Sequence, residues 1–561
     1  MRYLTETAKK YRALMAVYFL MGLACAFLQS FGASYFQKVI DRFTGHTLRA
    51  ADVAVYGTAM ILLYILNYLD EYPGRKLEHG IVLSLKTDAL RKVAAIDYLA
   101  YIKFGTGTLI QRIENGAAAG GSILFGFYLR LASELIPAML FSIGFIFALS
   151  RTVMAAILFG YAVVFIIANL LLKALYKVKT SILVNEEKLN HVLVRGFMEM
   201  AVFRVNRRFP CEIKKAEASS EEIVSSKVKM TLIHEAFFTV FAILVGFVKI
   251  GILIYGWRTN ALTAGEIVAL AALIDNAYQP IAVFNVLYVQ YKLDKIAFAR
   301  YAEFLDAKED LHLIQGMPFT ENNGEIAFSD VCFSYHEREI LQQFNLSIAR
   351  GTTTAFVGES GSGKSTVVKL LVGLLHPDSG CILMGGFDLG QINLNSYYRN
   401  IVYLSQDPPV FDGTLRENLT FDDSRDDAVL TDSLQQVGLG PIYSKLEKGL
   451  DTPLGEKGVS LSGGERQQLA LARLWLSDAG IVILDEATSA IDNLTEEAVM
   501  KNVMNRLAGR TVIAVAHRLD SVRTFEDILV FQNGRIVEHG AFDELMERQR
   551  CFYALYHRIH A

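Results

Sequence analysis

The chain has 561 residues, of which 52% are hydrophobic and 20% are charged, and its formal net charge at pH 7 is −3. Such a chain is too long for one ordinary soluble domain, and its near-neutral charge gives no overall basic signal for nucleic-acid binding. The apolar residues gather in residues 1–290, whereas residues 325–561 have the composition of a soluble α/β protein. The sequence therefore predicts a membrane half followed by a cytosolic half.

The chain begins with a charged tail, MRYLTETAKKYR, ahead of an apolar run from Leu14 to Phe36. A charged start before an apolar stretch can be a secretory signal peptide. This run has the length of a membrane span, however, and no small-residue cleavage site follows it, so we interpret it as a retained first membrane helix. Only about a dozen residues precede the run, so we expect no peptide-trimming domain ahead of the spans.

Six segments of the first half are apolar and long enough to cross a membrane: residues 14–36, 53–72, 122–148, 152–172, 234–256 and 264–288. A helix needs about 20 such residues to cross about 30 Å of hydrocarbon. The two long intervals, 73–121 and 173–233, mix apolar and charged residues at helical spacing. We therefore predict helices that run out into the cytosol and turn back near residues 98–106 and 196–208; ordinary loops are the alternative.

Lys and Arg residues indicate which side of the membrane each segment occupies. The N-terminal tail and the two long intervals hold most of the positive residues of this half, whereas the short connections hold only a handful. Loops rich in Lys and Arg stay on the cytoplasmic side. We therefore predict a multi-pass protein of the cell membrane (inner or plasma membrane), with the lipid bilayer as a partner and with the N-terminus and the second half in the cytoplasm.

Polar residues inside the predicted spans are of interest because such residues are rare in membranes. Arg130 and Glu134 lie four residues apart, so they share a helix face, and we interpret them as a structural pair. Asp275 and Asn276 lie midway along the sixth span, where they either form a path for a polar substrate or hydrogen-bond inside the bundle. The role of Lys249, late in the fifth span, is equally open.

The second half contains a complete phosphate-binding pattern. TTTAFV precedes it and STVVKLLVGLL follows it, as a strand and a helix would. Between them the residues match GxxxxGK[ST], in which backbone N–H groups and the start of a helix bind phosphate oxygens. Lys364 would contact these phosphates and the hydroxyl of Ser365 would ligate Mg²⁺. The predicted nucleotide-binding residues of the loop are Gly358, Glu359, Ser360, Gly361, Ser362, Gly363, Lys364, Ser365 and Thr366.

An acid pair follows a second buried strand. Four apolar residues, 481–484, precede Asp485 and Glu486. Asp485 is placed to hold Mg²⁺, and Glu486 lies at the carboxyl edge of the sheet, where ligands bind in such folds. A carboxylate there can orient and polarise the water that attacks a γ-phosphate. A solvated acid pair is the alternative, which the phosphate loop upstream disfavours.

A second glycine-rich turn, Ser462-Gly463-Gly464, opens the helix ERQQLALARLWL. This turn is another anion-binding feature at a helix N-terminus. One phosphate loop already surrounds the phosphates of a bound ATP, so a second such turn is useful only if it faces another nucleotide. In a head-to-tail pair of identical domains related by a two-fold axis, each turn would cap the γ-phosphate on its partner's loop.

Together these patterns resemble the ATP-binding cassette (ABC) transporters, and the order of six spans followed by a cassette is similar to an exporter-type half-transporter. The resemblance covers essentially the whole chain. It implies an N-terminal all-α transmembrane domain over residues 1–300, with six transmembrane helices and long cytoplasmic extensions. A linker over 301–324 and a C-terminal α/β P-loop NTPase domain of ABC type over 325–561 would follow.

The resemblance also implies roles for further residues. Tyr335 would stack on adenine, and Gln406 would bind Mg²⁺ and couple the cassette to the membrane half. Ser489 and Asp492 would form the D-loop, and His517 would contact the γ-phosphate as a second catalytic residue. Taken alone, Tyr335 and His517 would fit an ordinary strand aromatic and a loop histidine equally well. The signature motif that binds the partner's ATP would be Leu461, Ser462, Gly463, Gly464 and Glu465.

The resemblance implies an ATP-hydrolysing translocase that uses ATP and Mg²⁺ and works by closure of paired cassettes and alternating access. The catalytic positions all keep their active form, which favours a homodimer, and a heterodimer with a second half-transporter stays open. We expect outward movement of an amphiphilic drug, a lipid or a peptide. The alternatives are an importer of a metal chelate and an ATP-gated channel or sensor that pumps nothing. The sequence does not identify the cargo.

Overall fold

The computed structural model describes residues 1–560 except residues 261, 321–323, 422–423, 456–460 and 517. The chain forms two compact units. One unit contains Met1–Ala94 and Phe104–Ala307, and the other contains Ala95–Lys103 and Lys308–Ala561. The short internal segment Ala95–Lys103 thus belongs to the unit formed by the second half of the chain.

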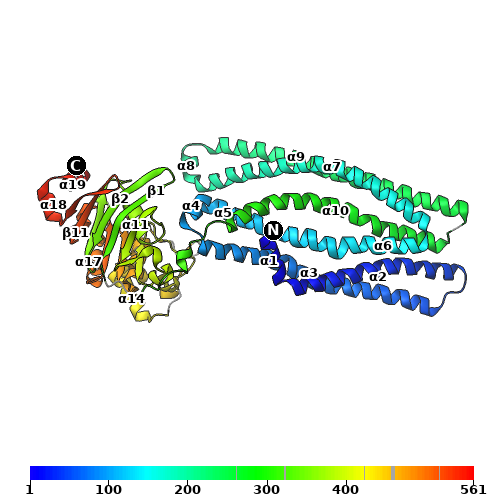
Figure 1. Cartoon of the computed structure of the whole chain (residues 1–561), viewed down its shortest axis with the longest axis horizontal. Coiled ribbons are helices and arrows are strands. Elements are labelled where there is room, and N and C mark those ends of the chain that lie inside the picture. Colours follow the sequence, from blue (N-terminus) through cyan, green and yellow to red (C-terminus); the bar gives the residue numbers. More distant parts are fainter. Residues whose placement is uncertain (261, 321–323, 422–423, 456–460, 517, 561) are drawn as a thin grey trace. The chain divides into compact units, whose positions relative to one another are not determined.

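The first unit is built from long helices (Figure 1). Each predicted span lies inside one continuous helical stretch, and the helices extend well beyond the spans, as expected. The third stretch passes without a break through α5, two π-helical segments (η1 and η2) and α6. The helices of this part of the chain are α1 (Arg2–Lys10), α2 (Arg12–Thr44), α3 (Ala50–Ala95), α5 (Thr106–Gly121), η1 (Ser122–Leu129), η2 (Leu131–Leu135), α6 (Ile136–Leu149), α7 (Arg151–Met198), α8 (Met200–Val205), α9 (Phe209–Thr259) and α10 (Ala264–Leu305).

Among the described residues, five helices are long and apolar enough to cross a membrane. A shorter apolar segment, Arg151–Val163, covers the start of the predicted fourth span. The predicted turns are short helices: α4 (Tyr98–Phe104) in the first long interval and α8 in the second. Helical extensions joined by turns are therefore confirmed over loops. The five long helices are Arg12–Thr44, Ala50–Ala95, Gly107–Leu149, Phe209–Thr259 and Ala264–Leu305.

Capping residues define the ends of the helices at the short connections. Thr263 opens α10 with a capping box, in which its hydroxyl accepts from the N–H of Glu266 and its own N–H donates to that glutamate. Asp41, near the end of α2, accepts hydrogen bonds from the Thr263 hydroxyl at 2.8 Å and from the N–H of Gly265 at 2.9 Å. A cap of this kind stabilises a helix start by about 1 kcal/mol. The bonds also tie the first connection of the bundle to the last.

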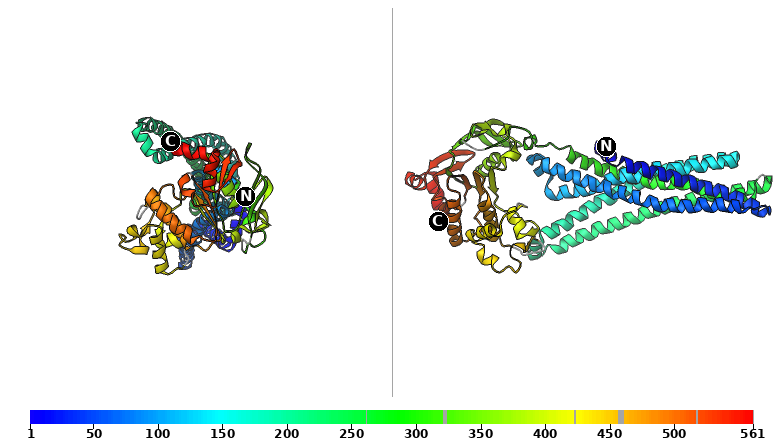
Figure 2. Two further views of the ribbon diagram at one scale, coloured as in Figure 1. Left: turned by 90° about the vertical axis from the view of Figure 1, so that its left-hand side faces the viewer. Right: turned by 90° about the horizontal axis from the view of Figure 1, so that it is seen from below.

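Helices α7 and α9, which α8 joins, lie side by side as a pair. The pair joins α6 and α10 through a buried apolar cluster that includes Ile157, Ile252 and Ile274. Towards α8 the pair diverges from α10 (Figure 2). At this end several large apolar side chains are exposed, among them Phe197 at 79%, Met198 at 80% and Val205 at 82%. We call residues 197–205 the α8 tip.

The second unit contains a six-stranded sheet with the order β12-β11-β3-β10-β9-β6. Its strands pair in parallel except for β12, which pairs antiparallel with β11. A four-stranded antiparallel sheet, β2-β1-β4-β5, and a small pair, β7-β8, complete the unit. The strands are β1 (Ile326–Tyr335), β2 (Arg338–Ile348), β3 (Thr353–Gly358), β4 (Ser379–Met384), β5 (Phe387–Asp388), β6 (Ile401–Leu404), β7 (Gly413–Thr414), β8 (Pro453–Leu454), β9 (Ile481–Asp485), β10 (Thr511–Val515), β11 (Asp527–Gln532) and β12 (Arg535–Gly540).

Helices cover the parallel strands, of which β9 and β10 are buried at every residue and read as largely apolar runs. This arrangement confirms the α/β fold expected for the second half. The helices of the unit are α11 (Lys364–Leu371), α12 (Leu394–Tyr397), α13 (Leu415–Thr420), α14 (Asp427–Gln436), α15 (Gly440–Tyr443), α16 (Gly463–Leu476), α17 (Asn493–Arg506), α18 (Phe542–Arg548) and α19 (Cys551–His560), with short 3₁₀ turns between them.

The segment Ala95–Lys103 is hydrogen-bonded to the start of the second half. The N–H of Asp97 donates to the carbonyl of Lys308 at 3.0 Å, and the N–H of Asp310 donates to the carbonyl of Ala95 at 2.9 Å. Tyr98 packs against the core of the unit, with the ammonium group of Lys369 5.7 Å from its ring centroid. The turn between two membrane helices is therefore built into the α/β unit.

Candidate nucleotide-binding site

The phosphate loop connects the central strand β3 to α11. Gly358 ends the strand at φ 144°, where a side chain would lie 2.3 Å from the carbonyl oxygen of Phe531, so only glycine fits. Gly361 and Gly363 also have positive φ values, 80° and 105°. The loop thus turns back on itself with its N–H groups ahead of the helix, as the sequence predicts.

Lys364 is the first residue of α11, and its side chain points back into the loop. Its ammonium group donates to the carbonyls of Gly358 at 2.7 Å and Glu359 at 3.0 Å and to the hydroxyl of Ser362 at 3.3 Å. The residue is only 5% exposed, and burial lowers the pKa of its ammonium group. Phosphate oxygens are stronger partners than these carbonyls because they carry negative charge. Ser365, next along the helix, is exposed.

The acid pair lies at the carboxyl end of β9. Asp485 is 8% exposed and accepts a hydrogen bond from the hydroxyl of Tyr403 at 3.1 Å. Glu486 has a left-handed backbone, with φ 52°, and its N–H donates to the carbonyl of Val515 on β10. Such a conformation costs a non-glycine residue about 1–3 kcal/mol and is often found at functional sites.

The structure brings two of the predicted residues into direct contact. The amide nitrogen of Gln406 donates to a carboxylate oxygen of Glu486 at 2.8 Å. Gln406 follows β6 and Glu486 follows β9, and these strands pair in parallel, so both residues leave the sheet at the same edge. A water bound by the carboxylate of Glu486 would therefore lie beside Gln406, from which the chain continues beyond the edge of the sheet.

The signature turn has a definite local structure. Ser462 caps α16 with a capping box: its hydroxyl accepts from the N–H of Glu465 at 3.3 Å, and its own N–H donates to the carboxylate of Glu465 at 2.7 Å. Gly464 lies against the D-loop, where a side chain would come within 2.8 Å of the carbonyl oxygen of Ala490. Ser462 itself is exposed, and Leu461 packs against the core.

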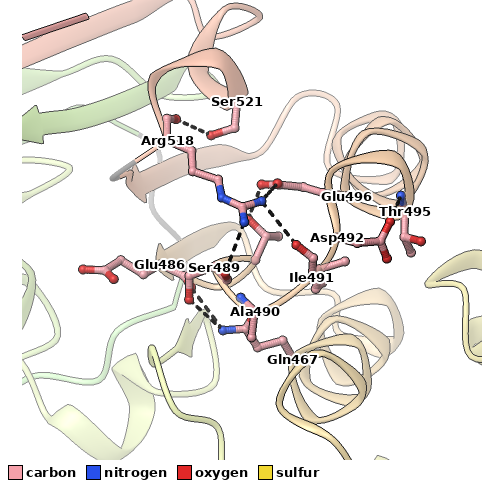
Figure 3. A network of polar contacts seen from close by, with 11 residues as sticks. Gln467, Glu486, Ser489, Ala490, Ile491, Asp492, Thr495, Glu496, Arg518 and Ser521 are labelled. Carbon is pink, nitrogen blue, oxygen red and sulfur yellow. Dashed lines mark hydrogen bonds and ion pairs between the residues drawn. The ribbon is translucent and has the colours of Figure 1, made fainter. Parts of the chain in front are cut away.

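Gln467 on α16 joins the site's loops, and the sequence analysis missed it. Its amide nitrogen donates to the carbonyls of Gln406 and Glu486 at 3.2 and 3.4 Å and to the hydroxyl of Ser489 at 3.1 Å. Its amide oxygen accepts from the N–H of Ala490 at 2.8 Å (Figure 3). The side chain is 3% exposed. The available signal was a polar pair, Gln467-Gln468, on a helix face that is otherwise apolar.

Arg518 holds the D-loop from the other side, and it too was missed. Its guanidinium group donates to the carbonyls of Ile491 at 3.2 Å and Ser489 at 3.4 Å, and it pairs with Glu496 at 2.5 Å (Figure 3). Asp492 caps α17 by accepting from the N–H of Thr495 at 3.0 Å, and backbone hydrogen bonding lowers the pKa of its carboxyl group.

The other predicted residues are placed as follows. Tyr335 ends β1, where its ring lies 4.9 Å from that of Phe333. His517 lies outside the described residues. The Mg²⁺ candidates Ser365, Gln406 and Asp485 offer a hydroxyl, an amide and a carboxylate oxygen, and Mg²⁺ prefers oxygen ligands. This donor set fits the ion chemically.

Comparisons with known proteins agree with this geometry. The family model described as "ABC transporter" matches residues 341–489. The chain is 34% identical to an uncharacterised ABC transporter ATP-binding protein of Bacillus subtilis, YwjA, over 365 residues, which is 63% of this chain and 60% of that protein. It is 29% identical to the ATP-dependent lipid A-core flippase of Alcanivorax borkumensis over 398 residues, 69% of this chain and 68% of the flippase. The chain thus spans less than two thirds of the first of these relatives.

The whole fold has a counterpart among solved structures. The structure of a bacterial Atm1-family ABC exporter with ATP bound superposes with a TM-score of 0.82, covering 98% of this chain and 99% of that chain, at 22% sequence identity. At this level of identity the likeness concerns the fold. It matches the helical unit as well as the α/β unit.

Proposed function

Because the chain belongs to the ABC transporters and has their exporter fold, with the membrane and ATP-binding domains fused, we propose that it is a half-transporter. Two such chains couple ATP hydrolysis to the movement of a substrate across the membrane. The observation that carries this proposal is the segment Ala95–Lys103, a turn between two membrane helices that belongs to the ATP-binding unit. A change in that unit must move the ends of α3 and α5.

The residues of the site support ATP hydrolysis. The phosphate loop and Lys364 bind the triphosphate, and Glu486 orients and deprotonates the attacking water. Ser365, Gln406 and Asp485 would hold Mg²⁺, which when bound neutralises charge on the β- and γ-phosphates. The bond from Gln406 to Glu486 supports a site in which the position of Gln406 and the orientation of the Glu486 carboxylate are linked.

A composite site in a dimer is supported by the signature turn. Ser462 is exposed at the start of α16, and the side-chain hydrogen bonds of Ser462 and Glu465 go to each other's backbone within that turn among the described residues. The N–H groups of such a turn suit a phosphate group that another chain presents. The apolar α8 tip also supports a dimer, since a second chain can cover its exposed side chains. A homodimer is the simplest assembly with these properties.

The exporter fold supports outward movement from the cytoplasm, and we propose an amphiphilic cargo such as a drug, a lipid or a peptide. Two other outcomes remain open to test: import of a metal chelate, and ATP-dependent gating without pumping. The membrane would be the cell membrane, with the cassettes on its cytoplasmic side.

Transport assays in proteoliposomes test the proposal. The purified chain should hydrolyse ATP, and a panel of labelled amphiphiles should include one that stimulates hydrolysis and accumulates against its gradient. Glu486→Gln should lower hydrolysis by about 100-fold or more, because a general base contributes that much to a rate, while ATP binding persists. Hydrolysis by Glu486→Gln at nearly the normal rate would contradict the assignment of the base. ATP-dependent conductance without uphill flux would favour a channel.

A further inference from the structure

The helical unit contains a cavity of about 630 Å³. Its walls come from α2, α3, the π-helical segments with the start of α6, and α10, so four of the stretches that hold predicted spans meet there. Pockets for small molecules usually measure about 300–1,000 Å³. The cavity is therefore large enough for an organic molecule.

The cavity wall is rich in acidic groups for a place among apolar helices. Its lining includes four carboxylates, from Asp70, Glu71, Glu78 and Glu134, but only two guanidinium groups, from Arg75 and Arg130. The lining is therefore two negative charges in excess when all six groups are ionised. Arg75 and Glu78 lie beyond the predicted second span, whereas Asp70 and Glu134 lie within predicted spans, where charged groups usually pair with one another or mark a path for a substrate or an ion.

Both arginines are already engaged. Arg75 donates to Glu71 at 2.7 Å and to Glu78 at 2.9 Å. Arg130 donates to Glu134 at 2.9 Å, as the sequence predicts, and Glu134 also accepts from the hydroxyl of Tyr18 at 2.6 Å. These bonds leave one acidic group of the lining to account for.

Asp70 is that group. One of its carboxylate oxygens is buried and has no hydrogen-bond partner among the residues that the structure describes. No ion pair of Asp70 is present among those residues either, and the negative charge of Glu134 is close enough to repel it. An ionised carboxylate in such a place is unfavourable unless a positive charge is supplied.

The backbone of the wall is also unusual. Arg130 separates the two π-helical segments η1 and η2, which together line the cavity next to Glu134. π-helical turns are rare and occur frequently at functional sites. In the same lining, Pro280 interrupts the hydrogen bonding of α10, and Asn276 of the same helix accepts from Gln29 at 3.0 Å.

We propose that this cavity binds the transported molecule through a positively charged group, and that Asp70 determines this charge specificity. Tyr18 and Phe125, whose ring centroids lie 5.5 Å apart in the lining, provide aromatic faces for an organic cation. The cargo class is therefore a lipophilic organic cation. This inference rests on the proposed transport function only in that the bound cation is taken to be the transported molecule. Binding of the cation itself needs no ATP.

Two probes of the same shape and opposite charge test the proposal: tetraphenylphosphonium, a cation, and tetraphenylborate, an anion. Their binding to the full chain in lipid nanodiscs is measured by titration calorimetry without nucleotide. We expect the cation to bind and the anion to bind at least about tenfold more weakly, because the anion meets unpaired carboxylate charge. Asp70→Asn should weaken the cation by about tenfold or more and narrow the difference between the probes. Asp70→Glu, which keeps the charge, should retain most of the binding.

Asp275→Asn is the matched control. Asp275 pairs with Lys249 at 2.6 Å and is not part of the cavity lining, so its removal should leave the binding of the cation unchanged. Equal binding of both probes, or an Asp70→Asn variant that binds the cation normally, would overturn the proposal. So would an equal loss of binding in Asp275→Asn. These results are independent of ATP hydrolysis, so they do not bear on the assignment of Glu486.

Discussion

Ser462 has two roles: it caps its own helix, and it would contact the nucleotide bound by the proposed partner chain. Its hydroxyl caps α16, and the residue itself is exposed at the start of that helix. Lys364, in contrast, is buried and serves only the loop of its own chain. The two residues should therefore fail in different ways when they are replaced.

Lys364→Ala should lose ATP binding, and hydrolysis with it, because the main positive charge in the loop is removed. Ser462→Ala should keep ATP binding but lose closure of the dimer and hydrolysis. It also loses a helix cap, which costs about 1 kcal/mol. Binding of a fluorescent ATP analogue, hydrolysis rate and thermal unfolding distinguish the two variants.

Thr414→Ala is the control for the loss of a cap. Thr414 forms the same kind of capping box with Glu417 at the start of α13. The variant should lose similar stability and keep its hydrolysis. If Thr414→Ala were as inactive as Ser462→Ala, the inactivity of the latter would reflect instability and not a missing contact with the nucleotide.

The sequence predicted the residues whose chemistry is local. Lys364, Asp485 and Glu486 were predicted because a loop, a strand and a helix of recognisable pattern surround them. Gln467 and Asp70 were not found, because their importance comes from partners that are distant in the chain. Gln467 contacts residues that follow β6 and β9, and Asp70 is notable for the positive partner that it lacks among the described residues.

At the scale of elements, α16 connects the signature turn to the catalytic edge of the sheet. Gln467, on the second turn of this helix, donates to the backbone after β6. It also holds the backbone after β9 and the D-loop, as Figure 3 shows. Arg518 fixes the other side of the D-loop. A displacement of α16 is therefore transmitted to Gln406 and Glu486 through one side chain.

Gln467→Ala should uncouple these loops. It removes a buried hydrogen-bonding group, which costs about 1–3 kcal/mol of stability, and we expect hydrolysis to fall by about tenfold, equivalent to about 1.4 kcal/mol in the barrier. ATP binding should change little. The measurements are kcat, nucleotide affinity and thermal unfolding.

Gln468→Ala is the neighbouring control, because Gln468 is 7% exposed on the same helix and forms no hydrogen bond with these loops among the described residues. Similar losses of stability with a loss of kcat only in Gln467→Ala are expected. An equal fall in kcat in both variants would show that any weakening of α16 slows the reaction.

The types and approximate extents of the long helices followed from the sequence. The spans were predicted from apolar runs, and the continuation of α7 and α9 into polar sequence was predicted from its helical spacing. Their i, i+3 and i+4 pattern persists there, and helices extend as long as that pattern and the absence of breakers allow. The π-helical segments around Arg130 could not be predicted, because an extra residue in a helical turn depends on the neighbours packed against it.

At the scale of the whole molecule, the central expectation is that a complete active site needs two chains. A mixture of Lys364→Ala and Ser462→Ala chains tests this directly. In a head-to-tail dimer of one chain of each kind, one site has both defects and the other has none. Random pairing makes half of the dimers mixed, so up to about a quarter of the normal activity should return.

After co-expression, hydrolysis is measured in the unsorted mixture and again after purification through a tag on each chain, which isolates the mixed dimers and should raise the activity to up to about half of normal. Each variant alone supplies the baseline, and the double variant Lys364→Ala with Ser462→Ala, mixed with either single variant, is the control. If the signature turn acted on its own chain's nucleotide, every mixture would stay inactive. That outcome would remove the argument for a composite site.

The segment Ala95–Lys103 has one more consequence. Just ahead of α4 it is hydrogen-bonded to Lys308 and Asp310 through Asp97 and Ala95, and it is followed by Gly105, whose φ of 71° allows a sharp bend. Bending can therefore concentrate at the two ends of the segment, at Ala94–Ala95 and at Lys103–Gly105. A disulfide or a proline that stiffened these two positions would leave ATP hydrolysis intact and uncouple it from the membrane helices. The resulting chain would hydrolyse ATP without moving a substrate.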